Sequence, residues 1–236
     1  MQLLVSVIDE HEVAAAVAGG ADVVDVKDPR EGSLGAAAPD VIRRVRELTP
    51  AATPVSAAIG DFPDLPGTAA LAAAGAAACG IEYVKVGLLG PRDGERARVL
   101  LGAVCRAARA QHPSVRIMAT AYADAEKVGS VPPLVLPAAA AAAGADGCMI
   151  DTAEKRGSTL FSELSADELA EFVARCRAAG LLCALAGSLR EEHVPQLADL
   201  GPDIVGFRGA VCQGDRVGGR VDAEAVRRLK ALTARP

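Results

Sequence analysis

The sequence has no tryptophan and only two tyrosines and four phenylalanines. A hydrophobic core must therefore be built from alanine, valine, leucine and isoleucine. Histidine is also rare: only His11, His112 and His193 occur, and none lies in an apolar, strand-like run. The six cysteines include no pair with CxxC spacing. These absences argue against a metal centre and a disulfide framework, and we interpret the cysteines as small buried residues.

The sequence also lacks a basic cluster and a long hydrophobic run. Because the net charge is −5 and no basic run occurs, nucleic acid is not expected as a partner. The longest apolar stretch, around residues 134–143, is too short to span a bilayer and contains Pro137. The first residues, Leu3–Ile8, read as a strand and not as a signal peptide. We therefore expect a cytoplasmic protein with no membrane partner.

Segments typical of strands and of helices alternate along the 236 residues. Strands are predicted at residues 3–8, 23–27, 53–59, 82–86, 115–122, 147–151, 182–186 and 203–207. Helices are predicted at residues 10–18, 38–48, 68–78, 93–111, 134–143, 166–179, 193–200 and 223–234. Eight such units predict an α/β fold, a TIM (β/α)8 barrel, formed by residues 1–236 as a single domain. An open doubly wound sheet is the alternative, but no glycine-rich turn follows the first strand.

The second predicted strand carries charged residues within an otherwise apolar run. Because side chains alternate along a strand, Asp25 and Lys27 share one face, whereas Val24 and Val26 share the other. Burying a charge is costly unless the charge is paired. Taken alone, this strand is compatible with either a buried structural ion pair or a functional site.

Two further strands end in similar groups. Lys85 lies at the end of the fourth predicted strand, Asp151 ends the sixth, and Lys155 follows in the next loop. In a (β/α)8 barrel the active site lies at the C-terminal ends of the strands, and alternate strands contribute side chains to the same layer. We therefore predict a catalytic cluster of five residues: Asp25, Lys27, Lys85, Asp151 and Lys155.

Clustered lysines favour a particular chemistry. A lysine that is partly desolvated and close to other cations has a lowered pKa, which makes the free amine accessible. A free amine attacks carbonyl groups and forms a Schiff base, while a second lysine or an aspartate moves protons on the adjacent carbon. The remaining cations suit an anionic substrate, so the set indicates a phosphorylated aldehyde or ketone.

The seventh and eighth predicted strands end in glycine-containing loops. Gly187 and Ser188 follow the seventh strand, and Arg208 and Gly209 follow the eighth. The corresponding loops of (β/α)8 barrels commonly bind phosphate through backbone N–H groups. We predict a phosphate-binding site there, with Arg208 adding positive charge. The alternative is that these glycines only form turns.

Five segments resemble the signature of the (5-formylfuran-3-yl)methyl phosphate synthase family. They are DVKDPREGSLG at residues 25–35, YVKVG at 83–87, DTAEK at 151–155, AGSL at 186–189 and DIVGFRGAVC at 203–212. The likeness runs nearly from end to end, and the first and third segments are long and specific. The resemblance implies a TIM barrel that condenses two molecules of glyceraldehyde 3-phosphate into a phosphorylated furan aldehyde, with loss of phosphate and water.

The resemblance also implies roles for individual residues. Lys27 would form the Schiff base and Lys85 would be the general base, while Asp25, Asp151 and Lys155 would assist in proton transfer and positioning. No metal or organic cofactor would be required, because the iminium itself is the electron sink. The partner would be a small-molecule substrate, and we also expect a homo-oligomer.

Two other functions are compatible with the sequence. A different Schiff-base aldolase acting on sugar phosphates would use the same lysines on the same fold, and its product would distinguish it. A non-catalytic barrel that binds a sugar phosphate would need no nucleophilic amine, so borohydride would trap no substrate on the protein.

Overall fold

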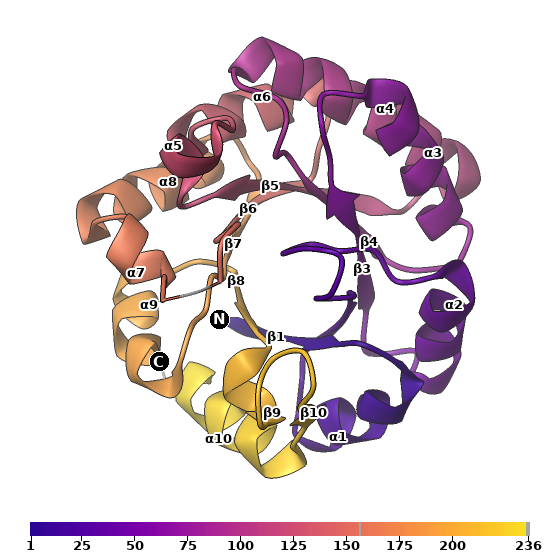
Figure 1. The fold of residues 1–236 in the computed structure, drawn as a ribbon, viewed down its shortest axis with the longest axis vertical. Helices are drawn as coiled ribbons and strands as arrows, with labels where there is room; N and C mark the ends of the chain where they lie inside the picture. Colours follow the sequence, from indigo (N-terminus) through magenta and orange to yellow (C-terminus); the bar gives the residue numbers. More distant parts are fainter. Residues whose placement is uncertain (156, 235–236) are drawn as a thin grey trace.

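A computed structural model of the protein describes residues 1–155 and 157–234. Eight parallel strands form a closed barrel in which consecutive strands pair and β8 pairs with β1 (Figure 1). The strands are β1 Gln2–Val7, β2 Val23–Val26, β3 Val55–Asp61, β4 Tyr83–Gly87, β5 Arg116–Tyr122, β6 Gly147–Asp151, β7 Leu182–Leu185 and β8 Ile204–Phe207. The predicted TIM barrel is confirmed, and the β1–β8 pairing excludes an open sheet.

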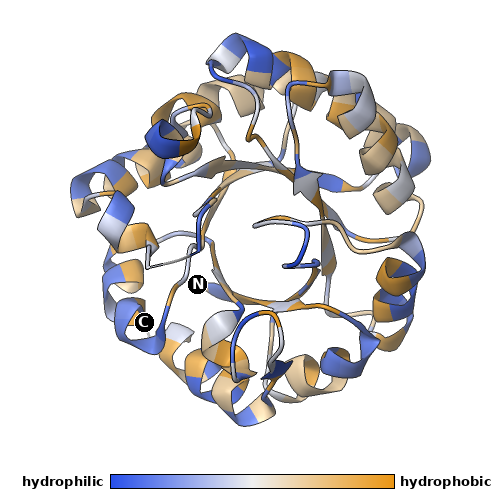
Figure 2. Ribbon diagram, viewed as in Figure 1, coloured by the Kyte–Doolittle hydropathy of each residue, from blue (hydrophilic) through white to orange (hydrophobic). Residues whose placement is uncertain are grey.

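Helices surround the barrel, with hydrophilic residues on their outer turns (Figure 2). The α-helices are α1 Val13–Ala18, α2 Pro39–Leu48, α3 Pro66–Ala77, α4 Gly94–Gln111, α5 Ala125–Val128, α6 Leu136–Ala143, α7 Leu160–Glu163, α8 Ala166–Ala178, α9 Val194–Leu200 and α10 Ala223–Thr233. Short 3-10 helices are η1 Glu10–Glu12, η2 Pro133–Val135, η3 Glu191–His193 and η4 Gly209–Val211. Within the described ranges, no helix has both the length and the apolar character needed to cross a membrane.

Among the described residues the buried hydrophobic side chains form three clusters, and the two larger parts of this core follow the alternation of side chains along the strands. Val24 and Val26 belong to the larger part, which lies between the strands and the helices. Val23 belongs to a smaller cluster inside the barrel, together with Leu4, Tyr83, Met118, Met149, Ala184, Ala186 and Ile204. The two faces predicted for the second strand are therefore confirmed.

The predicted elements agree with the observed ones to within a residue or two at most ends. The helix predicted to start at residue 10 begins as the 3-10 turn η1 and becomes α-helical only at Val13. The elements that were not predicted are short: α5, α7, η4 and a hairpin formed by β9 Cys212–Gln213 and β10 Arg220–Val221. Each of these elements is too short to produce a periodic apolar pattern, so it could not be predicted from the sequence.

Candidate active site

The C-terminal ends of the strands surround a cavity of about 260 Å³. Eight of the nine residues predicted for the site lie in its wall: Lys27, Lys85, Asp151, Lys155, Gly187, Ser188, Arg208 and Gly209. The ninth, Asp25, is fully buried and pairs with Lys85. The fold therefore brings the predicted residues together, while their roles in binding and catalysis remain predictions.

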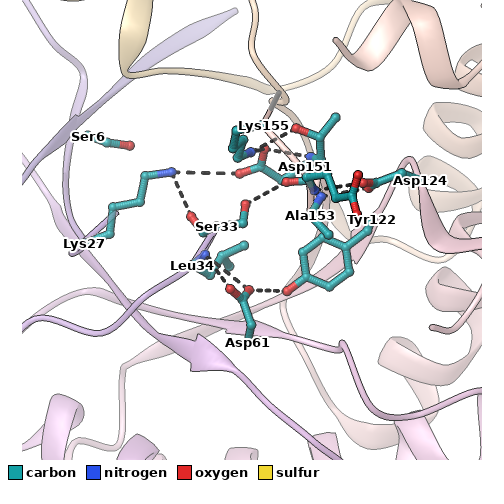
Figure 3. A network of polar contacts seen from close by, with 12 residues as sticks. Ser6, Lys27, Ser33, Leu34, Asp61, Tyr122, Asp124, Asp151, Ala153 and Lys155 are labelled. Atoms are coloured by element: carbon teal, nitrogen blue, oxygen red, sulfur yellow. Dashed lines mark hydrogen bonds and ion pairs between the residues drawn. The ribbon is translucent and has the colours of Figure 1, made fainter. Parts of the chain in front are cut away.

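Lys27 directly follows β2 and extends into the cavity. Its backbone N–H donates a hydrogen bond to the carbonyl oxygen of Val7 at 3.0 Å, so the residue continues the pairing of β1 with β2. The residue is only 6% exposed. Its Nζ donates to the carbonyl oxygen of Ser33 at 3.2 Å and lies 3.9 Å from Oδ2 of Asp151 (Figure 3).

The surroundings of Lys27 favour its neutral form. Burial lowers the pKa of Lys27 to about 8, with Lys85 and Lys155 also lowering it and with Asp151 and Asp25 raising it. An amine with a lowered pKa is neutral in a much larger fraction of molecules near neutral pH than an ordinary lysine is. Lys27 therefore combines access to the cavity with a usable fraction of nucleophile near neutral pH.

Asp25 and Lys85 form an ion pair inside the barrel. Both Lys85 Nζ and Ser6 Oγ donate hydrogen bonds to Oδ2 of Asp25, each at 2.8 Å. The other carboxylate oxygen, Oδ1, is buried and has no hydrogen-bond partner within the described part of the chain. A buried acceptor without a partner costs stability, and a purely structural ion pair would gain nothing from it. The arrangement therefore favours the functional interpretation of this strand.

Asp151, the last residue of β6, is shared by two lysines. Lys155 Nζ donates to its Oδ1 at 2.5 Å and to Oγ1 of Thr152 at 3.0 Å, and the Thr152 N–H also donates to Oδ1, at 2.8 Å. Burial alone would raise the pKa of Asp151, but Lys155 and Lys27 outweigh it and hold the pKa at about 2. Asp151 is therefore a carboxylate at neutral pH.

The loop that carries Lys155 is anchored by a residue that the sequence analysis did not identify. Asp124, just beyond β5, accepts hydrogen bonds from the N–H groups of Ala153 and Glu154 at 2.7 and 2.8 Å (Figure 3). Asp124 is 2% exposed, so these bonds are shielded from solvent. They hold the chain immediately before Lys155 and thereby help to position its amine.

The segment between β2 and α2 lies inside the ring of strands (Figure 1). Ser33 Oγ donates to the carbonyl oxygen of Thr152 at 2.8 Å, which links the segment to the end of β6. The Leu34 N–H donates to both carboxylate oxygens of Asp61 at 3.2 Å, and the Tyr122 hydroxyl also donates to Asp61 (Figure 3). These contacts place the Ser33 carbonyl against the Lys27 amine.

Two glycines allow this segment to pack closely. Gly32 has φ of 134°, and a Cβ there would lie 2.2 Å from Oδ2 of Asp61. A Cβ at Gly35 would lie 2.1 Å from the carbonyl oxygen of Asp28. Asp61 was not identified from the sequence, because a single carboxylate at a strand end carries no signal until its partners are known.

The loops after β7 and β8 present backbone donors to the cavity. Ser188 has φ of 49° and is the only non-glycine residue with positive φ within the described ranges. Such strained conformations cost about 1–3 kcal/mol and tend to cluster at functional sites. Among the described residues, the N–H groups of Gly187, Ser188 and Gly209 donate to no backbone or side-chain acceptor. These donors suit an anion such as phosphate.

Arg208 is 6% exposed, and its guanidinium is fully engaged within the protein. Nη1 donates to Oε2 of Glu12 at 2.5 Å and to the Ser6 carbonyl at 3.0 Å. Nη2 donates to Oε1 of Glu12 and to the Gly219 carbonyl, both at 3.2 Å, and Nε donates to the Arg216 carbonyl at 3.0 Å. All five N–H donors therefore have protein acceptors, so the predicted contact of Arg208 with phosphate would require one of these bonds to break.

Fold and site together define a TIM-barrel enzyme with a lysine–carboxylate centre at the mouth of the barrel. Residues 3–230 match the family described as 4-HFC-P synthase, and the chain belongs to this family. A protein from Methanocaldococcus jannaschii is 51% identical over 233 residues, which cover 98% of this chain and 99% of the relative. A protein from Methanothermobacter thermautotrophicus is 50% identical over 233 residues, 98% of either chain. Both are named (5-formylfuran-3-yl)methyl phosphate synthase, as the resemblance of the five segments predicts.

Solved structures support the fold at lower identity. A 3-hexulose-6-phosphate synthase aligns with a TM-score of 0.66 at 19% identity, covering 99% of this chain and all of the other. Phosphoribosyl anthranilate isomerase from Thermus thermophilus aligns with a TM-score of 0.64 at 16% identity, covering 99% of this chain and 98% of the other. At sequence identities this low, the similarity shows a shared barrel fold and does not show a shared reaction.

Proposed function

We propose that the protein condenses two molecules of glyceraldehyde 3-phosphate into (5-formylfuran-3-yl)methyl phosphate through a Schiff base on Lys27. The observation that carries this proposal is the Lys27 amine, which is buried in the cavity with a pKa of about 8 and lies beside Asp151. The family and the named relatives supply the identity of the product. The atoms balance when two trioses lose one phosphate and two waters.

The first triose would react at its aldehyde. Neutral Lys27 attacks C1, and loss of water gives an iminium. Lys85, whose Nζ is hydrogen-bonded to Asp25, then acts as the general base and takes the proton from C2. The electron pair of that C–H bond forms the C2–C3 double bond as phosphate leaves C3. The C2 hydroxyl makes the result an enol, and its C3 is a carbon nucleophile.

The carbon skeleton of the product determines the second half of the reaction. The ring carbon that bears the formyl group is C2 of the first triose, and the ring carbon that bears the phosphomethyl group is C2 of the second. The new bond therefore joins C3 of the first triose to C2 of the second, which must react as its ketose isomer. Ring closure and loss of two waters give the furan, and hydrolysis of the iminium frees Lys27 and the formyl group.

The remaining site residues would stabilise charge on the intermediates and position the substrate. Asp151 lies beside the Lys27 amine, where its carboxylate can stabilise the iminium, and Lys155, hydrogen-bonded to Asp151, can relay protons to the departing waters. The N–H groups of Gly187, Ser188 and Gly209 would bind a phosphate group. The iminium is the electron sink in this mechanism, so the proposal includes no cofactor.

The test is the product made by the purified protein from glyceraldehyde 3-phosphate, identified by mass spectrometry and NMR. The furan phosphate together with one equivalent of inorganic phosphate would support the proposal. A linear aldol product that keeps both phosphates would identify a different Schiff-base aldolase. Absence of any product and of any borohydride-trapped adduct would indicate a barrel that only binds sugar phosphates.

A further inference from the structure

Arg216 occupies an unusual position on the hairpin formed by β9 and β10. It lies in the wall of the active-site cavity together with Lys27 and Lys155. Its Nη2 is buried, and within the described ranges it has no hydrogen-bond partner. Burial lowers the pKa of Arg216, as expected for a cation moved away from water. A desolvated guanidinium nitrogen without an acceptor is costly, and an anion in the cavity would remove that cost.

The other two arginines of the cavity wall differ from Arg216. The donors of Arg208 are all taken by protein acceptors. The side chain of Arg190 is 68% exposed and lies 3.7 Å from the carboxylate of Glu192 at the surface. Arg216 therefore combines partial burial, access to the cavity and an unused donor.

The hairpin is built to hold Arg216 in place. Asp215 Oδ1 accepts hydrogen bonds from the N–H groups of Val217 and Gly218, both at 2.7 Å, which closes a tight turn around Arg216. A Cβ at Gly219 would lie 2.4 Å from the carbonyl oxygen of Gln213, so only glycine fits where the turn ends. Arg208 adds a hydrogen bond to the Arg216 carbonyl, so the cation is presented by an ordered backbone.

Arg216 also lies beside the predicted phosphate loop. A Cβ at Gly209 would be 3.8 Å from Cβ of Arg216, which makes the two residues neighbours. The Gly209 N–H is one of the unused backbone donors at the cavity, and Ser188 supplies another from the neighbouring strand end. Backbone donors from two loops and a guanidinium form the usual set of ligands for a phosphate monoester.

We infer that Arg216 binds the phosphate group of a triose phosphate substrate, and that Arg208 holds the hairpin from which Arg216 reaches the cavity. The identity of the triose rests on the proposed function, whereas the anion site rests on the geometry of Arg216. Arg216 is then a substrate-binding residue that joins the glycine loops of β7 and β8 in one phosphate site.

The experiment compares Arg216→Gln with the wild-type protein and with Arg220→Gln. Arg220 is a matched control because it lies on the same hairpin, is exposed and pairs with Asp9 at the surface. Calorimetry with inorganic phosphate measures the anion site without requiring any reaction. We expect Arg216→Gln to weaken phosphate binding about tenfold or more, as for loss of a charge-assisted hydrogen bond, and Arg220→Gln to leave it unchanged. Equal phosphate affinity in wild type and Arg216→Gln, or no binding to wild type, would overturn the inference.

Two further measurements distinguish binding of the substrate's phosphate from binding of the released phosphate and from a structural effect of the substitution. Arg216→Gln should raise the KM for glyceraldehyde 3-phosphate by a similar factor, while borohydride trapping of unphosphorylated glyceraldehyde on the protein stays at the wild-type rate. An unchanged KM with weaker phosphate binding would assign Arg216 to the released product and overturn the substrate role. Slower trapping of glyceraldehyde would mean that the hairpin had moved, which also contradicts the inference. If wild type traps neither aldehyde, the proposed function fails, while calorimetry still decides the anion site.

Discussion

Lys155 Nζ lies 2.5 Å from the carboxylate of Asp151, whereas Lys27 Nζ lies 3.9 Å from it. Because Coulomb attraction weakens with distance, Asp151 stabilises the Lys27 cation less than a contact ion pair would. Burial, together with the cations of Lys85 and Lys155, outweighs Asp151 and Asp25 and leaves the pKa of Lys27 at about 8. A site with two aspartates therefore still contains an amine of lowered pKa.

The pH dependence of Lys27 follows from this arrangement. The reactive form is the neutral amine, so the rate of borohydride trapping should rise with pH through a midpoint near 8. Lys155→Met removes a cation that lowers the pKa of Lys27 and leaves Asp151 to pair with Lys27 alone, so the midpoint should move to higher pH. Trapping rates measured from pH 6 to 10 test both statements. A midpoint that stays near 8, or falls, in Lys155→Met would contradict the explanation.

Lys27→Arg should be folded and inactive. The guanidinium keeps the positive charge but stays protonated and cannot form an imine. Circular dichroism would establish the fold, and peptide mapping after borohydride reduction with glyceraldehyde 3-phosphate would locate the adduct in wild type. An adduct on Lys85 or Lys155 in place of Lys27, or turnover by Lys27→Arg, would rule out this nucleophile.

Lys85→Ala should separate proton transfer from adduct formation. We expect turnover to fall about 100-fold or more, as for loss of a general base, while Lys27 still forms a trapped adduct. Exchange of the substrate C2 proton with deuterated solvent measures the proton transfer directly. Undiminished exchange in Lys85→Ala would remove Lys85 from this role. Arg190→Gln is a suitable control for a cation lost from the rim of the cavity, because its side chain is exposed.

Arg208→Ala should lower the free energy of unfolding. Glu12 is 1% exposed and would be left as a buried carboxylate without its partner, which typically costs about 3–5 kcal/mol. Urea denaturation measures the loss, and the double variant Glu12→Gln/Arg208→Ala should recover part of it. The role predicted for Arg208 from the sequence implies instead that Arg208→Ala weakens phosphate binding by about 1.5–3 kcal/mol. The two measurements together decide which role Arg208 has.

The sequence predicts those parts of the fold and site that depend on local pattern. Lys27, Lys85 and Asp151 could be placed together because each was predicted at the end of an apolar strand, and strand ends of a closed barrel share one mouth. In the structure, Lys85 lies in the middle of β4, two residues before the strand ends, and its side chain still lines the cavity. The environment of Arg208 could not be predicted, because its partner Glu12 lies 196 residues away in the chain. Arg216 could not be identified from the sequence for a similar reason. The path of its hairpin depends on hydrogen bonds from the turn to Asp215 and on the absence of a Cβ at Gly219, and neither produces a periodic pattern in the sequence.

The Ser33–Thr152 hydrogen bond joins two sides of the barrel mouth. It ties the segment after β2 to the end of β6, and the described part of the cavity wall includes no residue from β3 or β5. The cavity wall is formed mainly by the loops after β6, β7 and β8, together with Arg216 of the β9–β10 hairpin. If both trioses and the departing phosphate pass between these loops, we expect a sequential reaction in which the first triose becomes bound to Lys27, its phosphate leaves, and the second triose then enters.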